Sequence, residues 1–285
     1  MKRVRLSVAV FLCGAALSSV AAAQAASDQR SLLSRARQSY YGLHNEGLTA
    51  FQCTIKPDWN ALLADQRKQD PAAAKQAIAT LSQLLFTVNL SADGKVKVAH
   101  NDLSGQSQQM MAALAQIYGG MEQMTSGFFD TWTMFVLSPP FPALASEYRL
   151  ETVGPQYRLS YREGSAADVV TVMDRDFAIS DLRVTTPEFF STIQPSFTKT
   201  PKGFLLSGYD AHYQSKKAEE TTNLKVRIDY QEVERVQMLR KLDLSGTYGG
   251  TPFAVLLTFS DCQVTKKPSG RGYTIRPERS VVAMR

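Results

Sequence analysis

The sequence predicts an α+β fold in which helices cover one face of a curved antiparallel β-sheet, with a Met-rich helical insert. Two observations carry this prediction. From residue 148 onward, short runs of alternating apolar and polar residues recur about every ten residues, with turn residues between them, which is typical of an antiparallel meander. Helical periodicities precede the meander, and they supply the cover that the buried face of such a sheet needs.

Residues 1–25 contain the three parts of a secretory signal peptide. A positively charged start is followed by a long apolar run, and Ala23-Gln24-Ala25 fits a cleavage site. We expect cleavage there and a mature protein that is periplasmic or secreted. The alternative is an uncleaved membrane anchor, because the apolar run is about long enough to span a bilayer.

Residues 26–285 are expected to form a single domain, because no linker rich in Gly, Ser or Pro divides them. Its first elements are a helix and a strand. Ser27 is a candidate N-cap, apolar residues then recur at helical spacing, and Gly47 ends the pattern. Residues 48–55 alternate between apolar and polar, which predicts a half-buried strand.

Two further helices and a hairpin are expected before the insert. Asp58 is a candidate N-cap for a short helix. Asp70 precedes Pro71, a residue favoured at the first position of a helix, so a second helix is expected to begin there. Asp93-Gly94 stands between two apolar runs and predicts a β-hairpin.

The insert, residues 104–146, contains no Lys or Arg and is rich in Met and aromatic residues. Its apolar residues lie three or four positions apart, as in a helix, and Gly119-Gly120 is expected to break or kink that helix. The expected strands after the insert are residues 148–153, 157–161, 169–173, 179–184, 204–209, 224–230, 238–244, 253–259 and 273–275.

Two cysteines remain after the expected cleavage, Cys53 and Cys262. In an oxidising compartment such a pair is a disulfide candidate. The bond would join the first strand region of the chain to the last. The alternative is two buried free thiols, since cysteine is also an ordinary core residue.

Composition and motifs exclude several function classes. The formal net charge is +6, and three of the basic residues lie in the expected signal peptide, so the remaining charge is too small to indicate nucleic-acid binding. No zinc-binding spacing, hydrolase nucleophile elbow, P-loop or dinucleotide fingerprint occurs in the sequence. We therefore expect a protein that is not an enzyme, with no metal and no cofactor.

The insert is the best candidate for a binding surface, because Met is flexible and suits irregular apolar partners. The expected partner is a hydrophobic small molecule, a lipid or an acylated protein. The alternatives are an ordinary buried helical hairpin and an element at residues 128–141 that lies in a membrane interface. The expected ligand-binding residues are Met110, Met111, Leu114, Met121, Met124, Phe128, Phe129 and Trp132.

Two parts of the chain carry a resemblance to a known family. They are residues 36–52, which span the first helix and strand, and residues 229–261 late in the meander. They resemble the periplasmic lipoprotein carriers of the LolA type, although Met238-Leu239 stands where that family often has a proline. The resemblance implies an incomplete β-barrel whose apolar hollow holds acyl chains, and a non-enzymatic role in lipoprotein transport within the bacterial envelope. The alternative function is an envelope structural or assembly protein that uses the insert for contact with a protein or a membrane.

Overall fold

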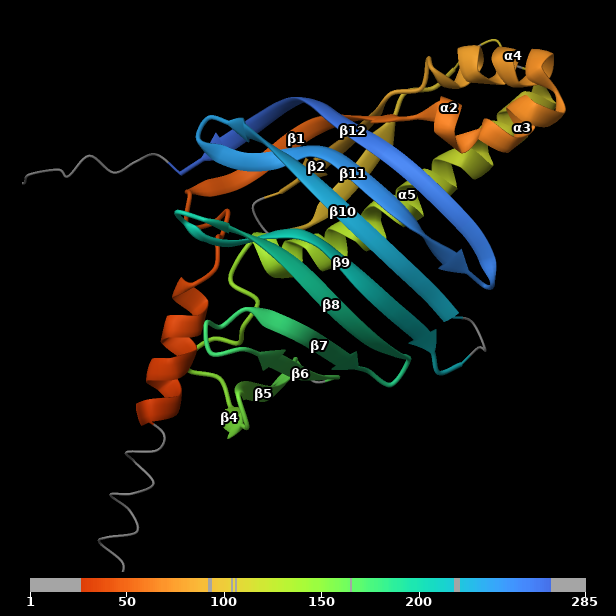
Figure 1. Ribbon diagram of the computed structural model, residues 1–285. Coiled ribbons are helices and arrows are strands. Elements are labelled where there is room, and N and C mark those ends of the chain that lie inside the picture. Colours follow the sequence, from red (N-terminus) through yellow and green to blue (C-terminus); the bar gives the residue numbers. More distant parts are fainter. Residues whose placement is uncertain are drawn as a thin grey trace, which may run out of the picture.

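Twelve strands form one antiparallel sheet that stays open, in the order β3-β2-β1-β12-β11-β10-β9-β8-β7-β6-β5-β4 (Figure 1). The computed structural model describes residues 27–91, 94–103, 105, 107–164, 166–217 and 221–267. The expected signal peptide, residues 1–25, and the expected strand at 273–275 lie outside these residues. The expectation of an α+β fold with a curved antiparallel sheet is confirmed, and the fold is mostly sheet.

The helices and strands follow the expected order along the chain. A helix over residues 27–38 comes first. The other helices are α2 (Trp59–Leu62), α3 (Ala64–Gln69), α4 (Pro71–Leu81) and α5 (Gln108–Val136). The strands are β1 (Leu48–Pro57), β2 (Phe86–Leu90), β3 (Val96–His100), β4 (Tyr148–Val153), β5 (Gln156–Glu163), β6 (Ala167–Met173), β7 (Ile179–Thr185), β8 (Phe189–Thr200), β9 (Gly203–Ser215), β10 (Thr221–Val233), β11 (Val236–Tyr248) and β12 (Thr251–Lys266).

The helix starts expected at Asp58 and Asp70 are confirmed, and each of these residues is an N-cap. The Asp58 carboxylate accepts a hydrogen bond from the Ala61 amide at 3.1 Å, and the Asp70 carboxylate accepts one from the Ala73 amide at 3.0 Å. Each side chain thereby satisfies a backbone donor that has no partner within its helix. The helices α2 to α4 form a lobe at one end of α5 (Figure 1).

One strand, β8, was missing from the expected meander. Pro195 interrupts its sequence, and a proline cannot donate a hydrogen bond to a neighbouring strand, which weakens the strand pattern. The structure accommodates Pro195 because β7 pairs with β8 only as far as Ile193, so Pro195 lies beyond the end of that pairing.

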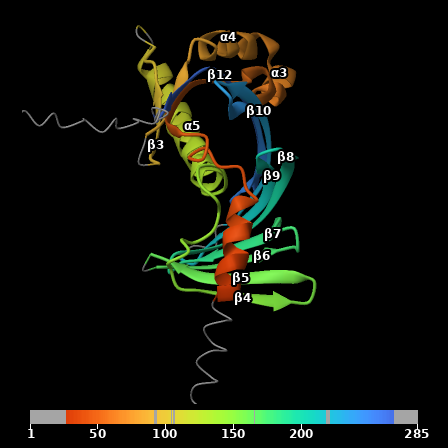
Figure 2. The same ribbon diagram turned by 90° about the vertical axis from the view of Figure 1, so that its left-hand side faces the viewer.

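The sheet bends because its register shifts by one residue at several places. The extra residues are Thr49 on β1, Ser180 on β7, Ser207 on β9, Arg240 on β11 and Asp261 on β12. Such bulges increase the local twist and bend the strand that carries them. The sheet consequently curves around α5, which lies inside the curve (Figure 2).

The expected break at Gly119-Gly120 does not occur, because α5 runs as one helix of 29 residues through both glycines. A Cβ atom at either position would have no neighbour within 4 Å, so both glycines lie on an open side of the helix. Each glycine costs about 0.5–1 kcal/mol relative to alanine. Burial of the aromatic residues further along α5 offsets that cost.

The disulfide between Cys53 and Cys262 is confirmed, and it joins β1 to β12. It lies where the register between these two strands shifts. The Gln231 side chain of β10 donates to the Leu239 carbonyl of β11 at 2.9 Å and to the Phe259 carbonyl of β12 at 3.2 Å. A covalent bond and a bridging amide therefore hold β1, β12, β11 and β10 together at this place.

Candidate binding site beneath helix α5

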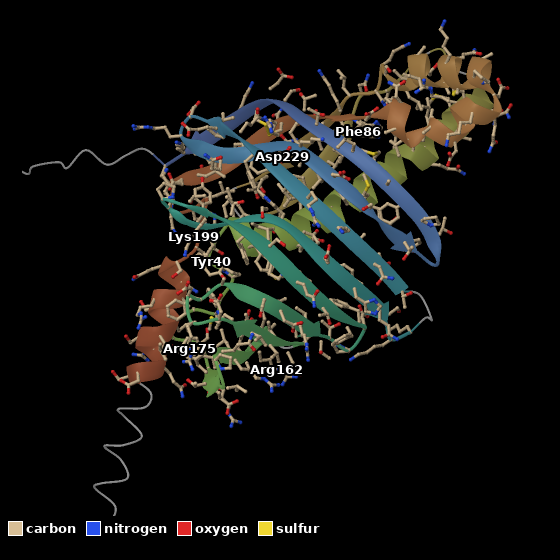
Figure 3. All side chains as sticks on the ribbon, in the orientation of Figure 1. Tyr40, Phe86, Arg162, Arg175, Lys199 and Asp229 are labelled. Carbon is tan, nitrogen blue, oxygen red and sulfur yellow. A yellow bond between two sulfur atoms is a disulfide. The ribbon has the colours of Figure 1, made fainter. Side chains whose placement is uncertain are left out.

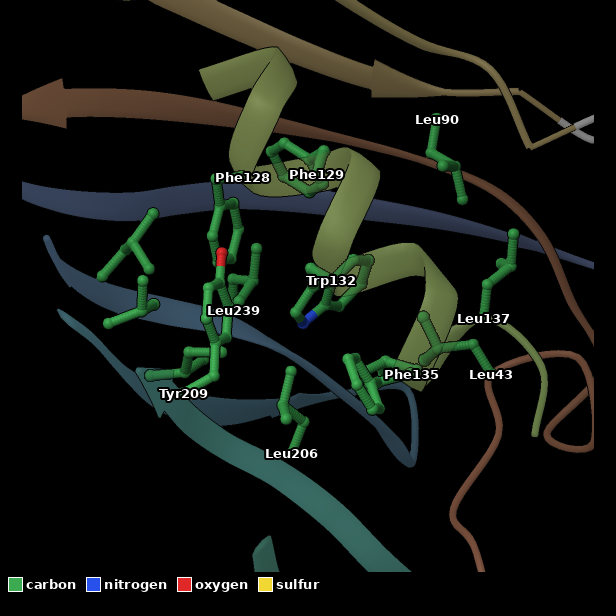
Figure 4. Close-up of a cluster of buried hydrophobic side chains, with 14 of the residues drawn as sticks. Leu43, Leu90, Phe128, Phe129, Trp132, Phe135, Leu137, Leu206, Tyr209 and Leu239 are labelled. Carbon is green, nitrogen blue, oxygen red and sulfur yellow. The ribbon is translucent and has the colours of Figure 1, made fainter. Parts of the chain in front are cut away.

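The concave face of the sheet and the inward face of α5 enclose one apolar interior. Phe128, Phe129, Trp132 and Phe135 are each at most 2 % exposed, and they insert between α5 and the strands (Figure 4). The rings of Phe129 and Trp132 each lie 6.1 Å from the ring of Phe51 on β1. Aromatic residues contribute much of the buried apolar area in such an interior.

The spacing of the buried residues explains why α5 presents this face. Leu114, Met121, Phe128 and Phe135 recur every seven positions, which places them on one stripe of a helix. The helix begins at a serine cap, because the Ser107 hydroxyl accepts a hydrogen bond from the Met110 amide. The Met-rich composition therefore produces a long amphipathic helix that can lie across the hollow of the sheet.

The expected ligand-binding residues do not gather in one lining. Leu114, Met121, Phe128, Phe129 and Trp132 are buried against the sheet, and Met124 is partly buried beside them. Met110 and Met111 are 36 % and 43 % exposed, because they lie near the N-terminal end of α5.

Hydroxyl and indole groups interrupt the apolar contact between α5 and the sheet. The indole nitrogen of Trp132 donates to the Tyr230 hydroxyl at 3.1 Å, and that hydroxyl donates to the Leu206 carbonyl at 2.7 Å. The hydroxyls of Thr131 and Tyr213 lie 3.1 Å apart. Burial raises the pKa of both tyrosines, so their hydroxyls are neutral at physiological pH.

Among the described residues, the buried hydroxyls of Thr125 on α5 and Thr171 on β6 have no hydrogen-bond partner, and both residues are 0 % exposed. The Tyr209 hydroxyl on β9, also 0 % exposed, interacts with the Thr131 hydroxyl, which lowers the pKa of Tyr209 against the larger effect of burial. Tyr209 rises from β9 toward Phe128 of α5 (Figure 4). A buried hydroxyl without a partner costs about 1–3 kcal/mol, and such groups are rare in folded proteins.

The alternating pattern of the sequence did not reveal these tyrosines as site residues. Tyr209 and Tyr230 fall in the expected strands 204–209 and 224–230, where they read as ordinary strand residues, and Tyr213 lies beyond the expected end of its strand. Their role depends on the sheet bringing them against α5, which precedes them by more than 70 residues.

A pocket of about 300 Å³ lies at the C-terminal end of α5. Its lining combines Met134 of α5 and Tyr161 of β5 with the proline-rich segment 138–146. Arg37 holds that segment from the first helix, because its guanidinium donates to the carbonyls of Phe141 and Pro142 at 2.8 and 2.7 Å. The pocket is completed by Ser138, Pro139, Pro140, Phe141, Pro142, Ala143, Ser146, Arg162, Glu163 and Gly164.

A second cleft, of about 600 Å³, lies within the lobe of α2 to α4. Arg67, Lys68 and Lys75 line it together with Asn60, Ala64, Pro71 and Ile78. Lys68 pairs with Asp65 at 2.8 Å on the exposed surface of α3. These cations are exposed to solvent, where single ion pairs contribute little.

Within the described ranges, no group of three His, Cys, Asp or Glu side chains is placed to hold a metal ion. Among the helices of that same part of the chain, none combines the length and apolar character needed to span a bilayer. Comparison of the chain with protein-family models, with curated proteins and with solved structures finds no match.

Proposed function

We propose that this protein is an exported, non-enzymatic carrier that binds a lipid or an acyl chain between the concave face of its sheet and α5. One observation carries the proposal: a single helix, supplied by the segment between β3 and β4, covers the apolar concave face of an open sheet. A ligand can enter between the sheet and this single helix without disrupting the strand pairings. The resemblance to carriers of the LolA type supports the same reading, and the disulfide is compatible with export.

The polar groups between α5 and the sheet are consistent with an α5 that can separate from the sheet. When α5 separates from the sheet, water or a ligand can hydrogen-bond to Tyr213, Tyr230 and Thr131, which lowers the cost of separation relative to a purely apolar contact.

The affinity for the ligand is the difference between two free energies: the gain from burying the ligand and the loss of the contacts that α5 makes with the sheet. An incoming acyl chain gains about 25 cal/mol for each Å² of apolar area buried. It must also replace the contacts that Phe128, Phe129 and Trp132 make in the ligand-free protein. Moderate affinity is therefore expected, which suits a carrier that has to release its ligand.

The fluorescence of Trp132 tests this proposal. The chain has two tryptophans, so Trp59→Phe leaves Trp132 as the only one. Trp132 is 0 % exposed, and displacement of α5 by added phospholipid or fatty acid should shift its emission to longer wavelength. The matched variant Trp132→Phe, which reports only from Trp59 on α2, should show no such shift.

Native mass spectrometry of the same samples provides the decisive readout. A one-to-one complex with lipid, together with the Trp132 shift, supports the carrier. If the protein is folded by circular dichroism but shows no bound lipid and no change in emission, the carrier proposal is ruled out.

An envelope structural or assembly role is the second candidate. It is favoured by the exposure of Met110, Met111 and Leu85, which are 36 %, 43 % and 46 % exposed. Exposed apolar side chains of this size can contact a protein partner or a membrane surface. Under this alternative, the double variant Met110→Ser and Met111→Ser should lose self-association or sedimentation with anionic vesicles, and lipid should not enter the interior.

A further inference from the structure

We infer that two copies of this protein associate edge to edge through β4, so that their sheets join across a two-fold axis at Leu150. The inference is independent of the proposed carrier function. Its starting point is the strand order, in which β4 stands at one end and β5 is its one neighbour among the described strands (Figure 1). An open strand edge carries unpaired backbone donors and acceptors, and these can pair with a strand of another chain.

The turn between β4 and β5 determines which backbone groups face the open edge. The Val153–Gln156 pair flanks a turn of two residues. In such a hairpin the flanking residues are hydrogen-bonded to each other, and the bonds recur at every second pair along the strands. The N–H and C=O groups of Tyr148, Leu150 and Thr152 therefore point away from β5. Among the described residues, no backbone hydrogen bond from another segment reaches these three residues.

The self-pairing centred on Leu150 places opposite charges against each other, and the neighbouring registers do not. With Leu150 opposite Leu150 of the second copy, Arg149 of each chain lies opposite Glu151 of the other. A shift of two residues is the smallest that keeps the outward backbone groups paired. It places either Arg149 opposite Arg149 or Glu151 opposite Glu151. Opposite charges directly across a strand pair stabilise it and like charges destabilise it, so the sequence of β4 favours one register.

The side chains on both faces of this joint fit each other. Arg149 and Glu151 lie on one face, with side chains that are 76 % and 37 % exposed, and they contact each other at 2.6 Å within one chain. Pairing would place each carboxylate beside two guanidinium groups, and such a network contributes more than a single exposed ion pair. On the other face Leu150, which is 5 % exposed, would meet Leu150 of the second copy.

The opposite edge of the sheet, β3, lacks this complementarity. In a self-pairing centred on Val98, the exposed Lys97 would face Ala99 rather than an acidic residue. Pairing of β3 with β4 would also repeat from copy to copy, whereas pairing of β4 with itself closes after two copies. Because the contact involves one short strand, it is smaller than a standard interface, and we expect a reversible dimer that forms at high protein concentration.

Charge reversal on β4 tests the inference with the purified mature protein. Sedimentation velocity should show a dimer whose fraction rises with concentration up to about 1 mM. The single variants Arg149→Glu and Glu151→Arg each bring like charges together, and each should dimerise about tenfold more weakly. An equimolar mixture of the two variants should restore the dimer, because the acidic edge of one variant then faces the basic edge of the other.

Two further variants separate strand pairing from a general effect of charge. Lys97→Glu reverses an exposed charge at the opposite edge of the sheet and should leave dimerisation unchanged. Thr152→Pro removes an N–H that points away from β5. The variant should therefore stay folded by circular dichroism while its dimer is lost.

Three results would overturn the inference. The first is an unmodified protein that stays monomeric over the whole concentration range. The second is a dimer that is equally stable in the unmodified protein and in both single variants. The third is a mixture of the two folded single variants that does not restore the dimer. Each of these results leaves the carrier proposal standing, because the interior beneath α5 is not part of the joint.

Discussion

Tyr40 and Ile179, which are 139 residues apart in the sequence, are joined by a hydrogen bond of 2.9 Å from the Ile179 amide to the Tyr40 hydroxyl. The same hydroxyl donates to the Phe177 carbonyl at 2.7 Å. Tyr40 lies where the first helix meets the sheet (Figure 3). Its hydroxyl therefore attaches the end of that helix to the turn between β6 and β7.

Replacing Tyr40 by Phe should destabilise the protein by about 1–3 kcal/mol, because two buried backbone groups would lose their partner. Urea unfolding followed by circular dichroism measures the change. Tyr248→Phe is the matched control, since Tyr248 is 54 % exposed and should tolerate the loss of its hydroxyl. Equal stability of the two variants would show that the Tyr40 hydrogen bonds contribute nothing.

Stability should fall in alkaline solution because several tyrosines are buried. Burial raises the pKa of Tyr41 to about 12, and it also raises the pKa values of Tyr40, Tyr209 and Tyr230. In the unfolded chain these pKa values are about 10. The folded state holds the protons more tightly, so the stabilisation is complete below about pH 10 and is lost as pH rises toward 12.

Urea midpoints measured from pH 7 to 11 check this dependence, with tyrosinate absorbance at 295 nm recorded in parallel. The absorbance should increase together with unfolding. A midpoint that stays constant to pH 11 would contradict the prediction.

Removal of the disulfide should lower stability by about 2–5 kcal/mol. The bond closes a loop with a sequence separation of 209, and the constraint on the unfolded chain grows with loop length. The thermal midpoint with and without reductant gives the effect. The double variant Cys53→Ala and Cys262→Ala is the control, and its midpoint should not respond to reductant. If the disulfide of the wild-type protein is shown to be reduced and the thermal midpoint does not change, the bond does not stabilise the fold.

Two substitutions of Gly by Ala should have opposite effects. At Gly203 the backbone has φ +113°, and a Cβ would lie 2.6 Å from the Ser39 carbonyl oxygen, so Gly203→Ala should destabilise by more than about 1 kcal/mol. At Gly119 a Cβ would have no neighbour within 4 Å, so Gly119→Ala should stabilise α5 by about 0.5–1 kcal/mol. Thermal midpoints compare the two, and a shift of the same sign in both would contradict the structure.

Local patterns in the sequence predicted most elements of the fold. The caps at Asp58 and Asp70, the hairpin of β2 and β3, and most strands of the meander follow from turn chemistry and alternation. The pattern failed at β8, where Pro195 weakens it, and at Gly119-Gly120, where tertiary packing overrides helix propensity.

The candidate site was less predictable than the fold. The composition of the insert identified Phe128, Phe129 and Trp132 as apolar, but it did not distinguish them from Met110 and Met111 near the end of the same helix. That distinction depends on where α5 crosses the sheet. The hydroxyls of the site come from strands far along the chain, so only the register of the sheet brings them to α5.

The strand order also sets when the sheet can be completed. β1 is made early, yet one of its two neighbours is β12, the last described strand. At a synthesis rate of about 5–20 residues per second, Cys53 waits on the order of tens of seconds before Cys262 exists. Throughout that interval one edge of β1 has no strand to pair with, and an unpaired edge invites association with other chains. A chain interrupted before β12 would keep its meander, but β1 to β3 would not be joined to it.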